Sequence, residues 1–160
     1  YPGGPVIDRL AQEGSPDAVR FPRGRKEGYD FSFSGLKTAV RNHVALFRSQ
    51  DAGLDPKMNV RDVAASFQAA VVDTLTDRTI QAAKETGARK IVVAGGVAAN
   101  SLLRSQMQDA ADKNGLKLFI PGLSYCIDNA AMVALTGYLH HQRGERSGLD
   151  LNPRASLPLK

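Results

Sequence analysis

The sequence predicts a helix-rich α/β fold with a short parallel sheet. Residues 90–94 are a short apolar run that is typical of a buried parallel strand, and residues 117–120 are expected to form a second strand. Residues 101–113, between them, have helical periodicity, and a helix that joins two parallel strands makes a right-handed βαβ unit. Because two strands alone do not form a stable sheet, the sequence indicates a sheet that requires further strands.

Apolar residues at helical spacing predict four more helices. They cover residues 6–10, 36–47, 59–85 and 128–142. Over residues 29–33, aromatic residues alternate with polar ones, which indicates a short strand or extended segment.

The longest predicted helix has clear signals at both ends. Asn59 is a good N-cap residue with Asp62 three positions later, and Gly87 is a natural stop. Its expected core-facing stripe consists of Val60, Val63, Ala64, Phe67, Val71 and Leu75. In the last helix, we expect Met132, Leu135 and Leu139 to face inward.

Residues 145–160 contain two prolines and are expected to form an extended coil. We therefore expect a domain over residues 1–144 and a tail over 145–160. The chain begins with Tyr1 rather than Met, so we also expect a segment upstream of it.

Composition sets wide limits on function. The chain has 160 residues, 42% of them hydrophobic, and 21 Lys and Arg against 16 Asp and Glu give a net charge of +5. This charge suits a polyanionic partner but is also common in ordinary basic domains. The single cysteine, Cys126, excludes an internal disulfide and a Cys-rich zinc site, and it favours a cytoplasmic setting. No apolar run approaches the ~20 residues of a membrane span, so we expect a soluble protein with no membrane partner.

The end of the first strand is one candidate site. Gly95 and Gly96 follow the strand directly, and glycines there let the backbone approach a ligand closely. The N–H groups of the next helix suit a phosphate, and Asn100 has the side chain to bind a ribose or a base. The alternative is a plain tight turn in which Asn100 caps the helix.

The end of the second strand is the other candidate site. Asp128 lies at a predicted helix start, where it is either an N-cap or a metal ligand. His43, His140 and His141 are not spaced to complete a metal site with each other. If Asp128 binds a metal, most of the site therefore lies outside these residues.

Three further features could bind phosphate or act as a nucleophile, but each also has a simple structural explanation. The basic segment 20–26 is either a solvated loop or a phosphate contact. Lys37 lies in a string similar to a phosphate-binding loop, but the spacing is wrong and a solvated helix residue is expected. Cys126 has no histidine nearby in sequence and is expected to be a buried filler.

Four strings carry a resemblance to a known family. In order, they are YPGGP at 1–5, FSFSGLKT at 31–38, GGVAAN at 95–100 and CIDNAAM at 126–132. Together they resemble the TsaD family, formerly called Gcp or O-sialoglycoprotein endopeptidase, over nearly the whole chain. The resemblance implies the C-terminal half of such a protein, within an actin/Hsp70/hexokinase-like (ASKHA, ribonuclease H-like) domain that is incomplete at its N-terminus.

The resemblance also implies an activity. Family members transfer a threonylcarbamoyl group from threonylcarbamoyl-AMP to the adenosine beside the tRNA anticodon, giving t6A. The positions that match the substrate-binding residues are Gly4, Asp8 and Asn100, with Gly95 and Gly96 in the nucleotide-facing turn.

A metal ion, iron or zinc, is the cofactor that the resemblance implies. Asp128 matches its carboxylate ligand, and two histidine ligands of an HxxxH motif are expected outside this chain, upstream of Tyr1. Ile127 stands where the family most often has Thr, which removes one hydroxyl from the site. We therefore expect the chain alone to be inactive and to bind metal weakly.

Two other functions remain as alternatives. One is the metal-dependent endopeptidase of the older family label, although no HExxH-like arrangement is present. The other is a non-catalytic module that binds nucleotide or partner proteins, or a fragment with no activity. The resemblance implies tRNA, TsaB and TsaE as partners, and unpaired strand edges predict self-association of the chain.

Overall fold

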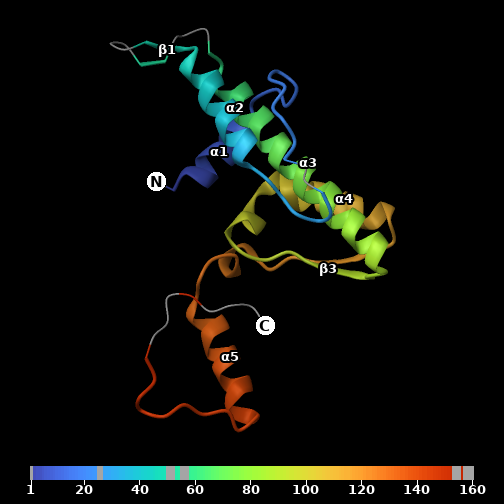
Figure 1. Ribbon diagram of the computed structural model, residues 1–160, viewed down its shortest axis with the longest axis vertical. Helices are drawn as coiled ribbons and strands as arrows, with labels where there is room; N and C mark the ends of the chain where they lie inside the picture. The colour runs from blue at the N-terminus through green and yellow to red at the C-terminus, as the bar shows by residue number, and fades with distance from the viewer. Residues whose placement is uncertain (1, 25–26, 50–52, 55–57, 153–155, 157–160) are drawn as a thin grey trace. The chain divides into compact units, whose positions relative to one another are not determined.

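The computed structural model describes residues 2–24, 27–49, 53–54, 58–152 and 156 (Figure 1). Its contacts divide the chain into two compact units, Tyr1–Cys126 and Ile127–Lys160. The predicted boundary after residue 144 falls inside the second unit. Each unit is described by itself.

All five predicted helices are confirmed, with shifts of a few residues at their ends. The α-helices are α1 (Gly3–Ala11), α2 (Ser34–Ala45), α3 (Val60–Thr86), α4 (Ser101–Lys113) and α5 (Ala130–Gln142), and η1 (Gly96–Ala99) and η2 (Leu123–Tyr125) are 3-10 helices. The strands are β1 (Arg48–Ser49), β2 (Gly53–Leu54), β3 (Lys90–Val92) and β4 (Lys117–Phe119). The antiparallel β1–β2 pair was not predicted. No helix in the described ranges is both long and apolar enough to cross a membrane.

Helix α3 is the element on which the first unit is assembled. It packs against both α1 and α4, and Figure 1 shows it running beside α2. Its predicted ends are confirmed: the Asn59 side chain accepts hydrogen bonds from the backbone N–H groups of Arg61 and Asp62, and Gly87 ends it at φ +70°.

The prediction of a single apolar stripe on α3 is wrong in part. Val60 is 42% exposed, whereas Ser66, Val72 and Thr74 are almost fully buried. The reason is that α3 has neighbours on several sides, so its burial does not follow one face. Three buried clusters lie along it: Phe21, Leu36 and Ala70; Val72, Leu103 and Met107; and Ile80, Ala83 and Ile91.

Strands β3 and β4 pair in parallel, as predicted, with Ile91 opposite Leu118. They form a two-stranded sheet, and α4 connects them. The expectation that the first strand is buried is wrong in part, because Ile91 is buried but Val92 is 73% exposed. In the second strand, Phe119 is also exposed. One face of this small sheet therefore carries apolar side chains that no described element covers.

The loop before α2 is fastened to α3. The Gly24 N–H donates to the buried Thr74 hydroxyl at 3.1 Å, and the Ser32 N–H donates to the Gly24 carbonyl at 3.2 Å. Arg23 forms an ion pair with Asp73. Arg23 is therefore used in the fold, while Arg25 and Lys26 of the predicted basic segment lie outside the described residues.

The predicted extended segment at 29–33 has one bridge residue, Phe31, and makes a polar contact with α3 through Tyr29. The Tyr29 hydroxyl donates to Glu85 at 2.7 Å, and Gln81 donates to the other oxygen of Glu85 at 2.8 Å. The Gln81 bond, and next the Tyr29 bond, lower the pKa of Glu85. The hydrogen bond to Glu85 raises the pKa of Tyr29.

Replacing Tyr29 with phenylalanine is expected to move the pKa of Glu85 back toward its ordinary value, because one donor to the carboxylate is lost. Since the folded-state pKa of Glu85 is lowered, the contribution of this carboxylate to stability is present at neutral pH and declines as the pH falls through its titration range. Carboxyl-carbon NMR titration measures this pKa. Tyr138→Phe is the control, and an equal change in both variants would contradict the assignment.

The second unit contains α5 (orange-red in Figure 1) and the tail. The helix begins at Ala130 rather than at residue 128, because Asn129, not Asp128, is the N-cap: its side-chain oxygen accepts from the Met132 N–H at 3.0 Å. The predicted inward face is wrong for the described residues, since Met132, Leu135 and Leu139 are all exposed. The described residues after Gln142 form no helix or strand, and residues 153–155 and 157–160 of the predicted coil lie outside the description.

Candidate functional site

A cavity of about 410 Å³ lies among the start of α1, the middle of α3 and η1. It brings together four of the five residues that the sequence predicted for the first site. They are Gly4, Asp8, Gly96 and Asn100. The other lining residues are Pro5, Ile7, Phe67, Gln68, Val71, Val72, Val97 and Ala99.

Gly95, the fifth predicted residue, directly precedes Gly96 of the cavity wall and determines the direction of the backbone there. Its φ of +90° lies in a region that other residues rarely adopt, and the chain turns there from β3 into η1. A Cβ at Gly95 or at Gly96 would meet no atom within 4 Å. The need for glycine at Gly95 is therefore conformational, whereas Gly96 keeps the cavity wall open.

Gly95→Ala is accordingly expected to lower the free energy of unfolding by about 1–3 kcal/mol, the usual cost of a strained backbone conformation. Gly96→Ala is the matched control. It has the same open space without the positive φ, so we expect a change within about 0.5 kcal/mol. Urea denaturation measures both, and equal losses would contradict the conformational explanation.

Asp8 and Asn100, which are 92 positions apart in the chain, are hydrogen-bonded to each other. The Asn100 Nδ2 donates to Asp8 Oδ1 at 3.1 Å and to Gln68 Oε1 at 2.9 Å. The Asn100 Oδ1 accepts from the backbone N–H of Leu103 at 2.9 Å. The N-cap interpretation of Asn100 is thus confirmed, and every polar atom of this side chain has a protein partner.

Asp8 occupies the N-terminus of α4. Its Oδ2 accepts from the Ser101 backbone N–H at 3.2 Å, and its Oδ1 accepts from the Ser101 hydroxyl at 2.7 Å. A carboxylate is favourable there because it offsets the helix dipole. The predicted phosphate position at the start of this helix is therefore already taken by a protein carboxylate.

The described lining of the cavity suits an apolar group better than a phosphate. Among the lining residues that the structure describes, none is Lys or Arg, and the carboxylate of Asp8 is the one ionisable side chain. Most of the remaining wall is aliphatic or aromatic. Such a cavity binds an uncharged ring by burying its faces, and polar groups at the edge fix its orientation.

Two residues at this site were not singled out from the sequence. Gln68 is buried in the middle of α3. A polar residue within an otherwise apolar helix stripe is the sequence signal that could have identified it. Arg104 of α4 donates to the carbonyl of Ala98 at 2.9 Å and to the carbonyl of Pro121 at 3.0 Å. It thereby joins η1 to the segment that follows β4. Nothing local in the sequence distinguishes Arg104 from a surface arginine.

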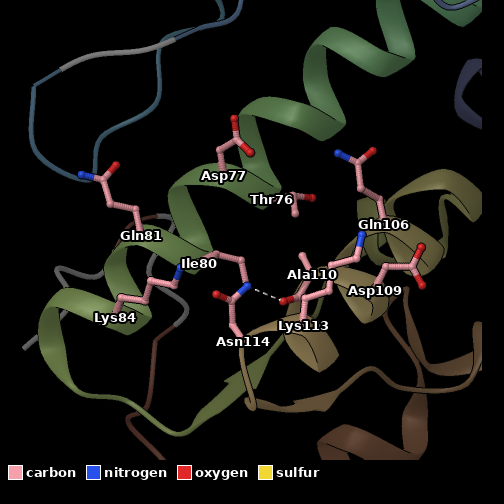
Figure 2. A pocket seen from close by; sticks show the side chains of 10 residues that line it. All are labelled: Thr76, Asp77, Ile80, Gln81, Lys84, Gln106, Asp109, Ala110, Lys113 and Asn114. Atoms are coloured by element: carbon pink, nitrogen blue, oxygen red, sulfur yellow. Dashed lines mark hydrogen bonds between the residues drawn. The ribbon is translucent and has the colours of Figure 1, made fainter.

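A second cavity, of about 570 Å³, lies between the far ends of α3 and α4 and contains none of the predicted residues (Figure 2). Its lining carries both signs of charge, with Lys84 and Lys113 as well as Asp77 and Asp109. The buried Thr76 hydroxyl on its wall has no hydrogen-bond partner in the described part of the chain. Its charges do not converge on one type of ligand.

The other candidates have simple surroundings. Asp128 is exposed, and its carboxylate forms no hydrogen bond or ion pair with the residues that the structure describes. Lys37 is exposed on α2, as expected. Cys126 is buried, with its sulfur beside the carbonyls of Pro121 and Gly122, which confirms a filler. His140 and His141 are exposed, and His140 pairs with Glu145.

Comparison with known proteins agrees with the sequence resemblance. The family model described as TsaD, tRNA N6-adenosine threonylcarbamoyltransferase, matches residues 1–135. The chain belongs to the TsaD family.

Curated relatives with the name tRNA N6-adenosine threonylcarbamoyltransferase match 99% of this chain. Identity is 48% for the relative from Thermosynechococcus vestitus, 51% for that from Geobacillus kaustophilus and 49% for that from Syntrophotalea carbinolica. Each match covers 46% of the relative, so the chain spans about half the length of the curated relatives it matches.

The described residues of this chain supply only part of the ligand set for the metal ion that the TsaD resemblance implies. Within the described residues, no group of three or more His, Cys, Asp or Glu side chains is arranged to hold a metal ion. The carboxylate of Asp128 is exposed and has no partner among the described residues, so it is chemically suited to be one ligand. A single carboxylate does not hold a transition metal by itself.

Proposed function

We propose that this chain forms the adenylate-binding part of a tRNA N6-adenosine threonylcarbamoyltransferase. The observation that carries the proposal is the cavity at α1, α3 and η1. It brings Gly4 and Asp8 of α1 together with Gly96 and Asn100, which lie about 90 positions later in the chain. The names of the curated relatives support this reaction. The parallel β3–α4–β4 unit supports the proposal that the chain is part of an actin-like (ASKHA) domain.

In the proposed reaction, the N6 amine of a tRNA adenosine attacks the carbonyl carbon of threonylcarbamoyl-AMP. A C–N bond forms, the C–O bond to the phosphate breaks, AMP leaves with the bonding electrons, and the amine loses its proton. The cavity would hold the adenine of the AMP part. Its apolar wall buries the ring, and the rigid turn at Gly95 and Gly96 keeps one edge open.

Asp8 and Asn100 would act mainly by positioning. Their polar atoms bind each other, Gln68 and the first turn of α4, so they hold α1, α3 and α4 around the cavity. With the start of α4 occupied by a carboxylate, the phosphate of the nucleotide would lie toward the open side of the cavity. This orientation differs from the phosphate cradle that the sequence suggested.

We also propose that Asp128 contributes one ligand to an iron or zinc ion whose other ligands lie outside the described residues. Such an ion would polarise or anchor an oxygen of the substrate. Asp128→Asn in the complete protein is expected to lower its metal content, measured by elemental analysis. Unchanged content would contradict the assignment, and Asp150→Asn is the control.

The proposed partners are tRNA, which suits the net charge of +5, and proteins of the TsaB and TsaE kind, in a cytoplasmic setting. A non-catalytic nucleotide-binding module remains the second candidate, because the polar groups of Asp8 and Asn100 are used within the protein. The older endopeptidase label gains nothing from the described residues, which contain no metal-binding cluster.

Calorimetric titration of the complete protein with AMP tests the site. We expect binding to the unmodified protein and its loss in Val97→Trp, because the indole would enter the cavity that Val97 lines. Leu46→Trp, at an exposed position outside the cavity, is the control. Binding that survives Val97→Trp would contradict the proposal. Formation of modified adenosine in added tRNA, measured by mass spectrometry, separates the enzyme from the non-catalytic module.

A further inference from the structure

Gln68 combines burial with an unused hydrogen-bond donor. Its side chain lies on α3, lines the cavity and is only 6% exposed. Its Oε1 accepts from Asn100 Nδ2, but its Nε2 donates to no residue in the described part of the chain. Although the side chain is mostly buried, this nitrogen is not among the enclosed polar atoms without a partner, so it is open to the cavity and available to a molecule bound there.

The network fixes which end of the amide faces the cavity. The backbone N–H of Leu103 requires an acceptor, so it holds the oxygen of the Asn100 amide toward α4. The Asn100 nitrogen must then point at Asp8 and Gln68, and only the oxygen of Gln68 can accept from it. The Gln68 nitrogen is consequently left as a donor, without any choice of amide orientation.

The surroundings of this donor restrict what it can bind. The neighbouring wall residues Phe67, Val71 and Val72 are apolar, and none of the described lining residues is a cation. A phosphate is disfavoured because the Asp8 carboxylate is the only charge among those described residues. A planar heterocycle with an acceptor nitrogen at its edge satisfies both the apolar wall and the single donor.

We propose that Gln68 is a base-recognition residue whose Nε2 donates to a ring nitrogen of the adenine bound in this cavity. The inference rests on the proposed function and adds the specificity contact to it. Because Asn100 and the first turn of α4 set the orientation of the amide, base recognition is coupled to the cap of α4. A purine lacking that nitrogen would cover the Gln68 donor without pairing it and would bind more weakly.

The test is a cycle of protein and ligand changes in the complete protein, with AMP and its 1-deaza, 3-deaza and 7-deaza analogues as probes. We expect one analogue to bind the unmodified protein about three- to tenfold more weakly than AMP, the usual range for one neutral hydrogen bond. In Gln68→Met, the affinity for AMP should fall by a similar factor, and the affinity for that analogue should not fall below its value for the unmodified protein. Gln81→Met, on the same helix outside the cavity, is the control and should bind like the unmodified protein.

Three outcomes would overturn the inference. Equal weakening of AMP and all analogues by Gln68→Met would show that Gln68 only supports the fold. Equal affinity of the unmodified protein for AMP and the three analogues would show that no ring nitrogen is recognised. Failure of AMP to bind the unmodified protein would instead overturn the proposed function together with the inference. Gln68→Leu, which also lacks the donor and adds no charge, is the second variant if Gln68→Met does not fold.

Discussion

Asn100→Ala is expected to lower the free energy of unfolding by about 2–3 kcal/mol. The alanine removes the cap of α4, which costs about 1 kcal/mol. It also leaves the buried oxygen of Gln68 without a donor, which costs a further 1–2 kcal/mol. Asp8 loses one of its hydrogen bonds as well. Urea denaturation measures the loss.

Asn100→Ser is the matched variant, because serine caps a helix equally well but does not reach Gln68. We expect it to recover about 1 kcal/mol of the loss. A change within 0.5 kcal/mol for Asn100→Ala would contradict the network described here. Binding experiments also need both variants. Loss of nucleotide binding in Asn100→Ala alone has two explanations, a lost contact with the nucleotide or a disturbed start of α4, and Asn100→Ser keeps the cap of α4.

Gly24→Ala is expected to destabilise the protein by about 3 kcal/mol. A Cβ at this position would lie 2.1 Å from the backbone carbonyl oxygen of Ser32, so the backbone must shift. The shift would strain both hydrogen bonds of Gly24, to the Thr74 hydroxyl and from the Ser32 N–H. Overpacking of this kind usually costs 1–3 kcal/mol, and a weakened buried hydrogen bond adds to it.

Gly35→Ala is the control for this prediction. Gly35 lies in the first turn of α2, where a Cβ would meet nothing within 4 Å. Alanine is the better helix former by up to about 1 kcal/mol, so we expect a neutral or stabilising change. Urea denaturation of the two variants should thus give opposite results. A loss of stability in both would show that the close approach at Gly24 is not the cause.

The parts of the fold that could be predicted depend on local signals. Helix α4 was predicted at its observed bounds, because Asn100 caps it and Gly115 follows it with a positive φ. The parallel pairing of β3 and β4 followed from the helix between them. The start of α5 was predicted at residue 128, but the side chain of Asn129 makes the capping bond and the helix begins at Ala130, because Asp128 and Asn129 are both residue types that cap helices.

The parts that could not be predicted depend on tertiary contacts. The buried face of α3 is set by α1, α4 and the loop at Gly24, which no periodicity in α3 reveals. At the site, the sequence identified Gly4, Asp8, Gly96 and Asn100 but not their connections. That Asp8 occupies the start of α4, 93 positions away, is visible only in the folded chain, and it changes the expected position of the phosphate.

The most direct test of this account is methyl NMR of the complete protein during titration with AMP. The two cavities provide an internal comparison, because Ile7, Val71 and Val97 line the first, and Ile80 and Ala110 line the second. We expect saturable shifts for the methyl groups of Ile7, Val71 and Val97, with those of Ile80 and Ala110 unchanged. Shifts confined to Ile80 and Ala110, or no shifts at all, would contradict the assignment of the cavity at α1, α3 and η1 as the adenylate site.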